Sequence, residues 1–112
     1  MNIKVEASKK IEDGVHTGVV TDVEYRDDPY EYTDVVIELP DKVQIKASYP
    51  TMICPTSKLG RLLVRFGQKL EIGNDLDPNK ILVGRRVVFQ TTSEDKGGVR
   101  YSKVLTESLQ PQ

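Results

Sequence analysis

The chain has 112 residues, and its hydrophobic content of 38% suffices for one modest core but not for two. Its formal net charge of -1 argues against a protein whose whole surface grips nucleic acid. The charge is unevenly divided, with six basic and eleven acidic residues up to Thr56 and ten basic and six acidic residues after it. We therefore expect a single domain over residues 1–112, with either an acidic and a basic side or an ordinary solvated surface.

The single cysteine, Cys54, excludes an internal disulfide, and the sequence has no cysteine and histidine set for a structural zinc site. No apolar run approaches the ~20 residues needed to span a bilayer. The first residues also lack the apolar core of a signal peptide. We expect a cytoplasmic protein that needs no metal and no organic cofactor and has no membrane partner.

Both ends of the chain are weak in structural signals. Residues 1–13 mix charged side chains with few apolar ones, which predicts a loosely held arm. Residues 107–112 are short and polar, which predicts a frayed tail. The structured part of the domain should therefore run from Gly14 to Thr106.

The first strand is expected over residues 15–25, which are rich in β-branched side chains. Their alternation places Val15, Val19 and Val23 on one face. Gly18 lies inside this strand and lowers its stability, so it predicts a bulge or a sharp bend where the strand changes partner.

Two hairpins follow. The polar segment 26–32 contains a proline and predicts the loop of the first hairpin. Alternating patterns predict the second strand over residues 33–39 and the third over residues 42–49, joined by a tight turn at Pro40-Asp41. The prolines in segment 50–55 predict a crossing loop, because proline cannot sit easily in a central ladder.

One segment, residues 57–66, carries helical periodicity between clear start and stop signals. Its apolar residues fall at i, i+3, i+4 and i+7: Leu59, Leu62, Leu63 and Phe66. Thr56 or Ser57 can cap the first turn, and Gly67 can take the left-handed conformation that ends a helix. We expect the apolar stripe to be buried with the core of the sheet: Val19, Ile37, Ile45, Val87 and Phe89.

The last third of the chain returns to strands. Asp77 suits an N-cap and Pro78 a first helical position, which predicts a short helical turn over residues 78–83. Strand four is expected over residues 85–92 and strand five over residues 99–106. The apolar residues of strand five fall on both parities, so a bulge would be needed to bring them to one face.

Three strands, a helix and a final hairpin predict an all-β fold: a five-stranded OB-like Greek-key barrel with one capping α-helix between strands three and four. The stretch 14–106 resembles the small OB-fold single-stranded nucleic-acid-binding proteins of phage and archaeal replication, which are similar in shape to replication protein A. Three segments carry the resemblance: 57–63, 82–87 and 98–104. It implies a protein that binds single-stranded DNA or RNA with weak sequence preference, in replication or repair.

The usual OB ligand face is the outer side of strands two and three with the flanking hairpin loops. Here that face and the start of strand four supply candidate nucleic-acid-binding residues: Arg26, Tyr30, Tyr32, Gln44, Lys46, Arg85, Arg86, Lys96 and Arg100. Tyrosine rings stack on bases and cations hold the backbone. Asp34 and Glu38 fall on the same face and oppose phosphate binding, and the two loop tyrosines can also serve only to pack the loop.

No arrangement in the sequence predicts an enzyme. His16, the only histidine, lies within a strand, and Cys54 has an apolar setting in which a thiol behaves as a small hydrophobe. Asp27-Asp28 lacks the further oxygen ligands of a calcium loop. Gly97-Gly98 precedes no helix, so it is a hairpin turn rather than a phosphate cradle.

A second hypothesis is a structural or assembly module that binds another protein chain or a copy of itself. The near-zero net charge and the acidic residues on the expected ligand face favour it. Lys58, Arg61 and Arg65 form a basic stripe opposite the leucines of the predicted helix. Such a stripe is either solvated or belongs to a second surface.

Overall fold

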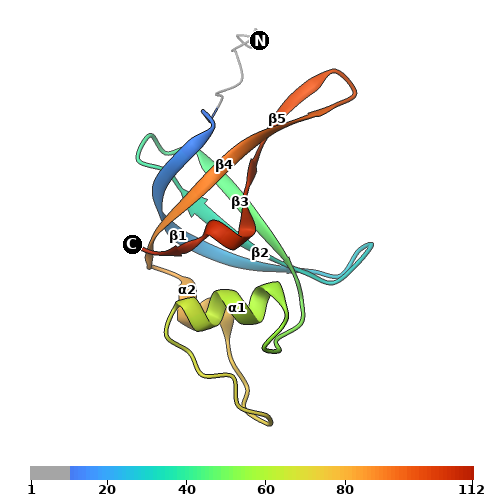
Figure 1. The fold of residues 1–112 in the computed structure, drawn as a ribbon, viewed down its shortest axis with the longest axis vertical. Coiled ribbons are helices and arrows are strands. Elements are labelled where there is room, and N and C mark those ends of the chain that lie inside the picture. The colour runs from blue at the N-terminus through green and yellow to red at the C-terminus, as the bar shows by residue number, and fades with distance from the viewer. Residues whose placement is uncertain (1–10) are drawn as a thin grey trace, which may run out of the picture.

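The computed structural model describes residues 11–112, apart from the side chain of Lys96, and most of it is antiparallel β-sheet (Figure 1). The strand order is β3-β2-β1-β4-β5, and β6 pairs with β4. The strands are β1 (Gly14–Arg26), β2 (Tyr32–Glu38), β3 (Gln44–Pro50), β4 (Arg86–Lys96), β5 (Val99–Val104) and β6 (Gln110–Pro111). Helices α1 (Lys58–Arg65) and α2 (Pro78–Leu82) lie together beneath the sheet in this view.

The sheet does not close into a barrel. Its end strands β3 and β5 approach each other but do not pair. The segment that follows β5 also lies against β3, where the Tyr49 hydroxyl donates to the carbonyl of Thr106 at 2.9 Å. The predicted all-β architecture is confirmed, but the sheet is not closed into a barrel, and it has six strands rather than the predicted five because the C-terminal segment adds β6, which pairs with β4.

Strand β1 changes partner near its middle. Val19 is opposite Arg86 of β4 and also opposite Glu38 of β2. Gly18 is needed beside this crossing, because a Cβ there would lie 2.7 Å from the Glu38 carbonyl oxygen. The register shift itself lies between Val20 and Asp22, beyond the glycine. The sequence predicted a bulge or a sharp bend at Gly18 where the strand changes partner; the change of partner lies beside this glycine, and the bulge follows it.

This bulge explains one wrong prediction about the core. Val19 was expected to be buried in the core of the sheet, on the same face as Val23, but it is 39% exposed, and its neighbour Val20 is buried instead. Val23, beyond the bulge, packs partly against the core. The extra residue reverses the parity of the strand, so no single alternation describes its whole length.

Helix α1 covers the core as predicted. Leu59, Leu62 and Leu63 are fully buried, and Phe66 nearly so. They pack in one cluster with the predicted sheet residues Ile37, Ile45, Val87 and Phe89. Helix α2 begins as expected, with the Asp77 carboxylate accepting from the Asn79 amide at 3.0 Å and Pro78 in the first turn.

The start of α1 is fixed by Ser57. Its hydroxyl oxygen accepts from the amides of Gly60, at 2.9 Å, and Cys54, at 3.1 Å. The hydroxyl also lies 3.0 Å from the Cys54 carbonyl oxygen, to which it donates. Gly60 lets the helix approach this loop, because a Cβ there would lie 2.0 Å from the same carbonyl oxygen. Of the two caps that the sequence allowed, the structure uses Ser57.

The β4–β5 hairpin is longer than predicted and projects away from the helices (Figure 1). Its turn is Gly97-Gly98, and both glycines have positive φ. The register from Thr91 opposite Val104 to Lys96 opposite Val99 is continuous, so no bulge brings the apolar residues of β5 to one face. Val104 is buried whereas Val99 is exposed, because the hairpin tip extends beyond the core.

The C-terminal segment is held, contrary to the predicted fraying of residues 107–112. It forms a short 3-10 helix, Thr106–Ser108, and then β6. Leu109 is fully buried in the core. Arg65 of α1 donates to the carbonyl of Leu109 at 2.8 Å and to that of Thr106 at 3.1 Å. Arg61 pairs with Glu107 at 2.6 Å. These two arginines of the basic stripe therefore anchor the tail.

Of the predicted N-terminal arm, only residues 11–13 fall within the described part of the chain. Their backbone carbonyls receive hydrogen bonds from Ser102, which donates to Ile11 at 2.9 Å, and from Thr91, which donates to Glu12 at 2.8 Å. This end of the arm is thus attached to β4 and β5. Across residues 11–112 no helix has both the length and the apolar character needed to cross a bilayer.

Candidate nucleic-acid interface

The outer face of β2 and β3 is formed by alternate residues that point away from the core. Core residues Val35 and Ile37 define the inner parity of β2, so its outer residues are the intervening ones. The pairs that cross the two strands on this outer face are Tyr32 with Pro50, Asp34 with Ser48, Val36 with Lys46, and Glu38 with Gln44. Three predicted site residues, Tyr32, Gln44 and Lys46, thus share one surface, which we call the outer face.

Asp34 is the centre of a hydrogen-bonded network on the outer face. Arg26 of β1 donates to both of its carboxylate oxygens, at 2.6 and 3.1 Å, and the Ser48 hydroxyl donates at 2.7 Å. The guanidinium of Arg26 also lies 5.2 Å from the centre of the Tyr32 ring. Arg26 and Tyr32, both predicted to contact nucleic acid, therefore also contact each other, and Arg26 is hydrogen-bonded to Asp34.

The network changes the ionisation of its members. Burial by itself would raise the pKa of Asp34, but the hydrogen bonds from Arg26 and Ser48 outweigh burial and lower this pKa. The hydrogen bond to Asp34 raises the pKa of Arg26. Asp34 is thus an ionised carboxylate whose charge is balanced by Arg26, so it repels phosphate less than the sequence suggests.

Lys46 also has a carboxylate partner. Its ammonium lies 3.1 Å from a carboxylate oxygen of Glu24, and both side chains are about half exposed. An exposed pair of this kind contributes little to stability, so a phosphate can replace the carboxylate at small cost. Lys46 remains a possible phosphate contact, but the neighbouring Glu24 reduces its attraction.

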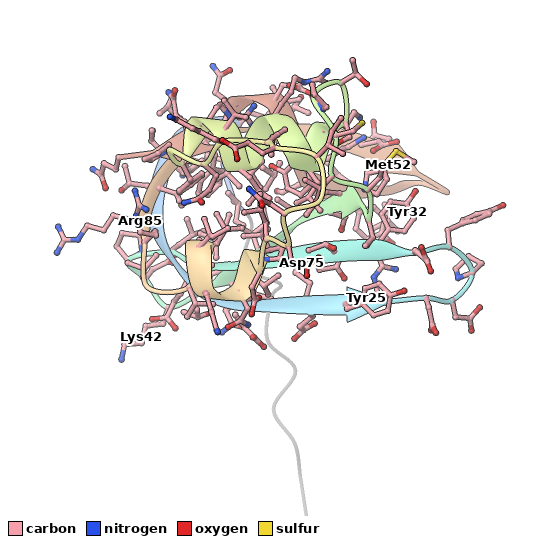
Figure 2. All side chains as sticks on the ribbon, turned by 90° about the horizontal axis from the view of Figure 1, so that it is seen from below. Tyr25, Tyr32, Lys42, Met52, Asp75 and Arg85 are labelled. Atoms are coloured by element: carbon pink, nitrogen blue, oxygen red, sulfur yellow. The ribbon has the colours of Figure 1, made fainter. Side chains whose placement is uncertain are left out.

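Tyr30 lies in the β1–β2 loop and is the most exposed of the candidate rings, at 71%. In both views this loop and the tip of the β4–β5 hairpin project toward the same side of the molecule (Figures 1 and 2). The ring of Tyr101, on β5, is 54% exposed. The sequence prediction did not include Tyr101, because the apolar residues of strand five fall on both parities and leave its inner face undecided.

Arg100 is on the other side of the hairpin. It pairs with Asp13 at 3.5 Å. Alternation places Tyr101 and Lys103 together on the opposite face, where Lys103 lies 3.9 Å from Glu94. The backbone of Lys96 ends β4, but its side chain lies outside the described part of the structure. Regular alternation along β5 is the sequence signal that separates Tyr101 from Arg100.

Arg85 and Arg86 are distant from the tyrosines. Figure 2 shows Arg85 and Lys42 at one end of the molecule and Tyr32 toward the other. The guanidinium of Arg85 stacks 5.2 Å from the centre of the Phe66 ring. Arg86 lines a shallow hollow that also contains Lys42. The structure therefore separates the predicted site into a tyrosine end and a basic end.

No protein-family model matches this sequence, and the curated proteins include none that is recognisably similar to it.

His16 and Cys54, the two residues considered for catalysis, each form a hydrogen bond with a nearby residue. The His16 Nε2 atom lies 2.5 Å from the Glu12 carbonyl oxygen, and its ring centre is 6.1 Å from that of Phe89. Cys54 is half-buried rather than buried, and hydrogen bonding with Thr56 lowers the pKa of its thiol. In the described part of the chain, no three His, Cys, Asp or Glu side chains gather as metal ligands would.

Proposed function

We propose that this protein binds single-stranded DNA or RNA without strong sequence preference, as a binding protein rather than an enzyme. The observation that carries the proposal is the exposure of two tyrosine rings, Tyr30 and Tyr101, on two hairpins that project to the same side of the molecule. Large exposed rings interact favourably with unpaired bases, which offer a π-face whatever their identity.

The arrangement of the elements supports the same proposal. Strand β1 lies between β2 and β4, the end strands β3 and β5 approach each other, and α1 falls between β3 and β4 in the chain. We infer that the sheet is an open variant of the OB fold, with a Greek-key order and with the C-terminal strand β6 paired with β4. In OB folds the usual nucleic-acid surface is the face of strands two and three, between the β1–β2 and β4–β5 loops.

Charge predicts how such binding should behave. Arg26 is held by Asp34, while Lys46 and Lys103 are the exposed cations of this surface and each lies near a carboxylate. We therefore expect stacking to contribute more than phosphate pairing. With two phosphate contacts, the slope of log binding constant against log salt should be no steeper than about -1.5.

Fluorescence anisotropy with a labelled oligothymidine of about 20 nucleotides tests the proposal, because this length covers an OB site of ~4 to 16 nucleotides. Tyr30→Ala and Tyr101→Ala should each weaken binding by about 1 to 3 kcal/mol, with little change in the salt slope. Lys46→Ala and Lys103→Ala should reduce the slope instead. Tyr25→Ala, which removes an exposed ring from the other face of β1, is the matched control.

Two results would exclude the proposal. One is no change in anisotropy at low salt with protein in large excess. The other is binding that Tyr30→Ala and Tyr101→Ala leave unaltered. The first result would favour the hypothesis that the domain binds another protein chain.

A further inference from the structure

An open groove of about 620 Å³ lies between the loop that leaves β3 and the loop that joins α1 to α2. Its lining is largely apolar and includes Met52, Ile53, Leu70 and Ile72. Met52 is 62% exposed, and Ile72 is fully exposed. Apolar side chains gathered at this exposure, outside the core, are typical of an interaction surface.

A second hollow of about 310 Å³ extends this surface toward the sheet. It shares Thr51, Ile53 and Leu76 with the first groove and reaches the exposed ring of Tyr25. Figure 2 looks onto this end of the molecule and shows Tyr25 and Met52 on one side of it, with Asp75 nearer the middle. We call the two connected hollows the loop groove.

Backbone hydrogen bonds hold both walls of the loop groove. On one side the amide of Thr51 donates to the Glu31 carbonyl at 3.1 Å, and that of Met52 donates to Pro50 at 2.9 Å. On the other side Asn74 donates through its amide to the Glu71 carbonyl at 3.1 Å and through its side chain to the Glu71 carboxylate at 3.2 Å. A groove that is already formed loses less entropy when it binds a ligand.

The charges of the loop groove have one sign. Glu71 and Asp75 line the larger hollow, and Glu24 and Asp77 line the smaller one. No lysine or arginine among residues 11–112 lines either hollow. Of the four carboxylates, Glu24 has the ion-pair partner Lys46.

The surroundings of Tyr25 are also acidic. Partial desolvation of its hydroxyl and the nearby carboxylates of Glu31 and Asp27 raise the pKa of this tyrosine. The acidic character thus continues beyond the lining of the loop groove, into the β1–β2 loop.

We propose that the loop groove binds a short segment of another protein in which apolar side chains are flanked by lysine or arginine. The apolar side chains of that segment bury against Met52, Ile53 and Ile72, and its cations pair with Glu71 and Asp75. The same carboxylates repel phosphate, which disfavours nucleic acid and anionic lipid as occupants. This site shares Glu24 with the outer face, but it does not depend on the proposed nucleic-acid binding.

The test begins with a random library of 12-residue peptides displayed on phage and selected on the immobilised full chain. Met52→Asp and Ile72→Asp proteins serve for counter-selection, because each places a charge in the apolar part of the groove. The selected peptides should be rich in lysine or arginine beside leucine, isoleucine or an aromatic residue. An acidic consensus, or no enrichment over the counter-selected pool, would overturn the proposal.

Peptides synthesised from that selection are then measured by fluorescence anisotropy. Met52→Asp and Ile72→Asp should weaken binding at least about ten-fold, as expected for central apolar contacts. Glu71→Gln with Asp75→Asn should weaken it about three- to ten-fold at low salt and less at high salt. Val64→Asp is the matched control, since Val64 is an exposed valine on α1 outside both hollows.

Cys54 provides an independent report on the site, because it lines the groove and is the only cysteine of the chain. Bound peptide should slow its reaction with a thiol-specific reagent. Displacement of the peptide by oligothymidine would contradict the proposal. So would a dimer in sedimentation that Met52→Asp converts to monomer, because the occupant would then be a second copy of this chain.

Discussion

The outer face and the loop groove differ in whether their carboxylates form ion pairs within the protein. At the centre of the outer face, Asp34 receives hydrogen bonds from Arg26 and Ser48, and Glu24 pairs with Lys46. In the loop groove, Glu71 and Asp75 take part in no ion pair within residues 11–112. The two carboxylates at the centre of the outer face are thus paired with cations of the protein, whereas Glu71 and Asp75 of the loop groove are not.

This difference follows from where the residues lie. Register fixes which residues meet across neighbouring strands, so a sheet can place Ser48 opposite Asp34 and bring Arg26 beside it. A loop has no such ladder, and its carboxylates remain exposed to solvent or to a ligand. The contrast indicates that paired charges maintain the outer face, while unpaired ones in the loop groove are available for recognition.

The largest effect should come from Leu63→Ala, which removes a fully buried side chain of α1. The cavity should lower the free energy of unfolding by about 2 to 5 kcal/mol. Chemical denaturation measures it. Because α1 supports the loops that form the groove, hydrogen exchange should accelerate there more than in β1–β3. Equal acceleration in both regions would remove the distinction between them.

Asp34→Asn should have the next largest effect, because it breaks the closed network of the outer face. Loss of the charged partner of Arg26 and Ser48 should cost about 1.5 to 3 kcal/mol at pH 7. Denaturation midpoints of the two proteins give the difference. Ser48→Ala, which removes one hydrogen bond but keeps the ion pair, should cost less.

The difference in stability between wild type and Asp34→Asn should also depend on pH. The pKa of Asp34 is lowered in the folded protein, so its contribution is complete above the ordinary carboxyl pKa of about 3.9 and is lost as pH falls through the folded value. Wild type and Asp34→Asn should therefore converge in stability below about pH 4. A gap that stays constant down to pH 2 would mean that the charge of Asp34 does not stabilise the network.

Ser57→Ala should lower stability less, because it affects only the start of α1, next to the loop groove. It removes the acceptor for the amides of Gly60 and Cys54 and should cost about 1 kcal/mol. The thermal midpoint reports the loss. Thr56→Ala is the control, because Thr56 does not cap the helix, and it should shift the midpoint less. If Thr56→Ala were the more damaging change, the cap would be assigned to the wrong residue.

The smallest effect on stability should come from Glu24→Gln, which opens an exposed pair on the outer face. The free energy of unfolding should change by at most about 1 kcal/mol. Oligonucleotide affinity should nevertheless rise a few-fold at low salt, because Lys46 loses its competing carboxylate. Asp77→Asn, in the loop groove, should leave oligonucleotide affinity unchanged. A larger gain in affinity from Asp77→Asn would indicate that the oligonucleotide binds at the loop groove rather than at the outer face.

Local signals in the sequence predicted much of the fold. Ser57 and Asp77 can cap helices through their own side chains, and the alternation of β3 from Ile45 to Tyr49 survives unchanged because that strand is regular. These features depend on neighbours a few residues away, so the order of residues is sufficient to find them.

Long-range features could not be predicted in this way. Arg65 looked like a solvated cation because its partners, the carbonyls of Thr106 and Leu109, lie more than 40 residues further along the chain. The loop groove likewise combines residues 51–55 with residues 70–76, and no pattern within either segment indicates the other. Partners of this kind are set by tertiary packing rather than by periodicity.

The role of Leu109 has a consequence for how the protein is made. Leu109 is buried in the core, and Arg65 of α1 contacts the carbonyls of Thr106 and Leu109 and the carboxylate of Glu107, all from the same late segment. On the ribosome, β1 to β4 and both helices emerge before this residue. Until it follows them, the nascent domain has an unfilled hollow and an unbonded guanidinium. We therefore expect the core to be completed only after Leu109 has been synthesised, and a stall before Leu109 would present chaperones with an unfinished core.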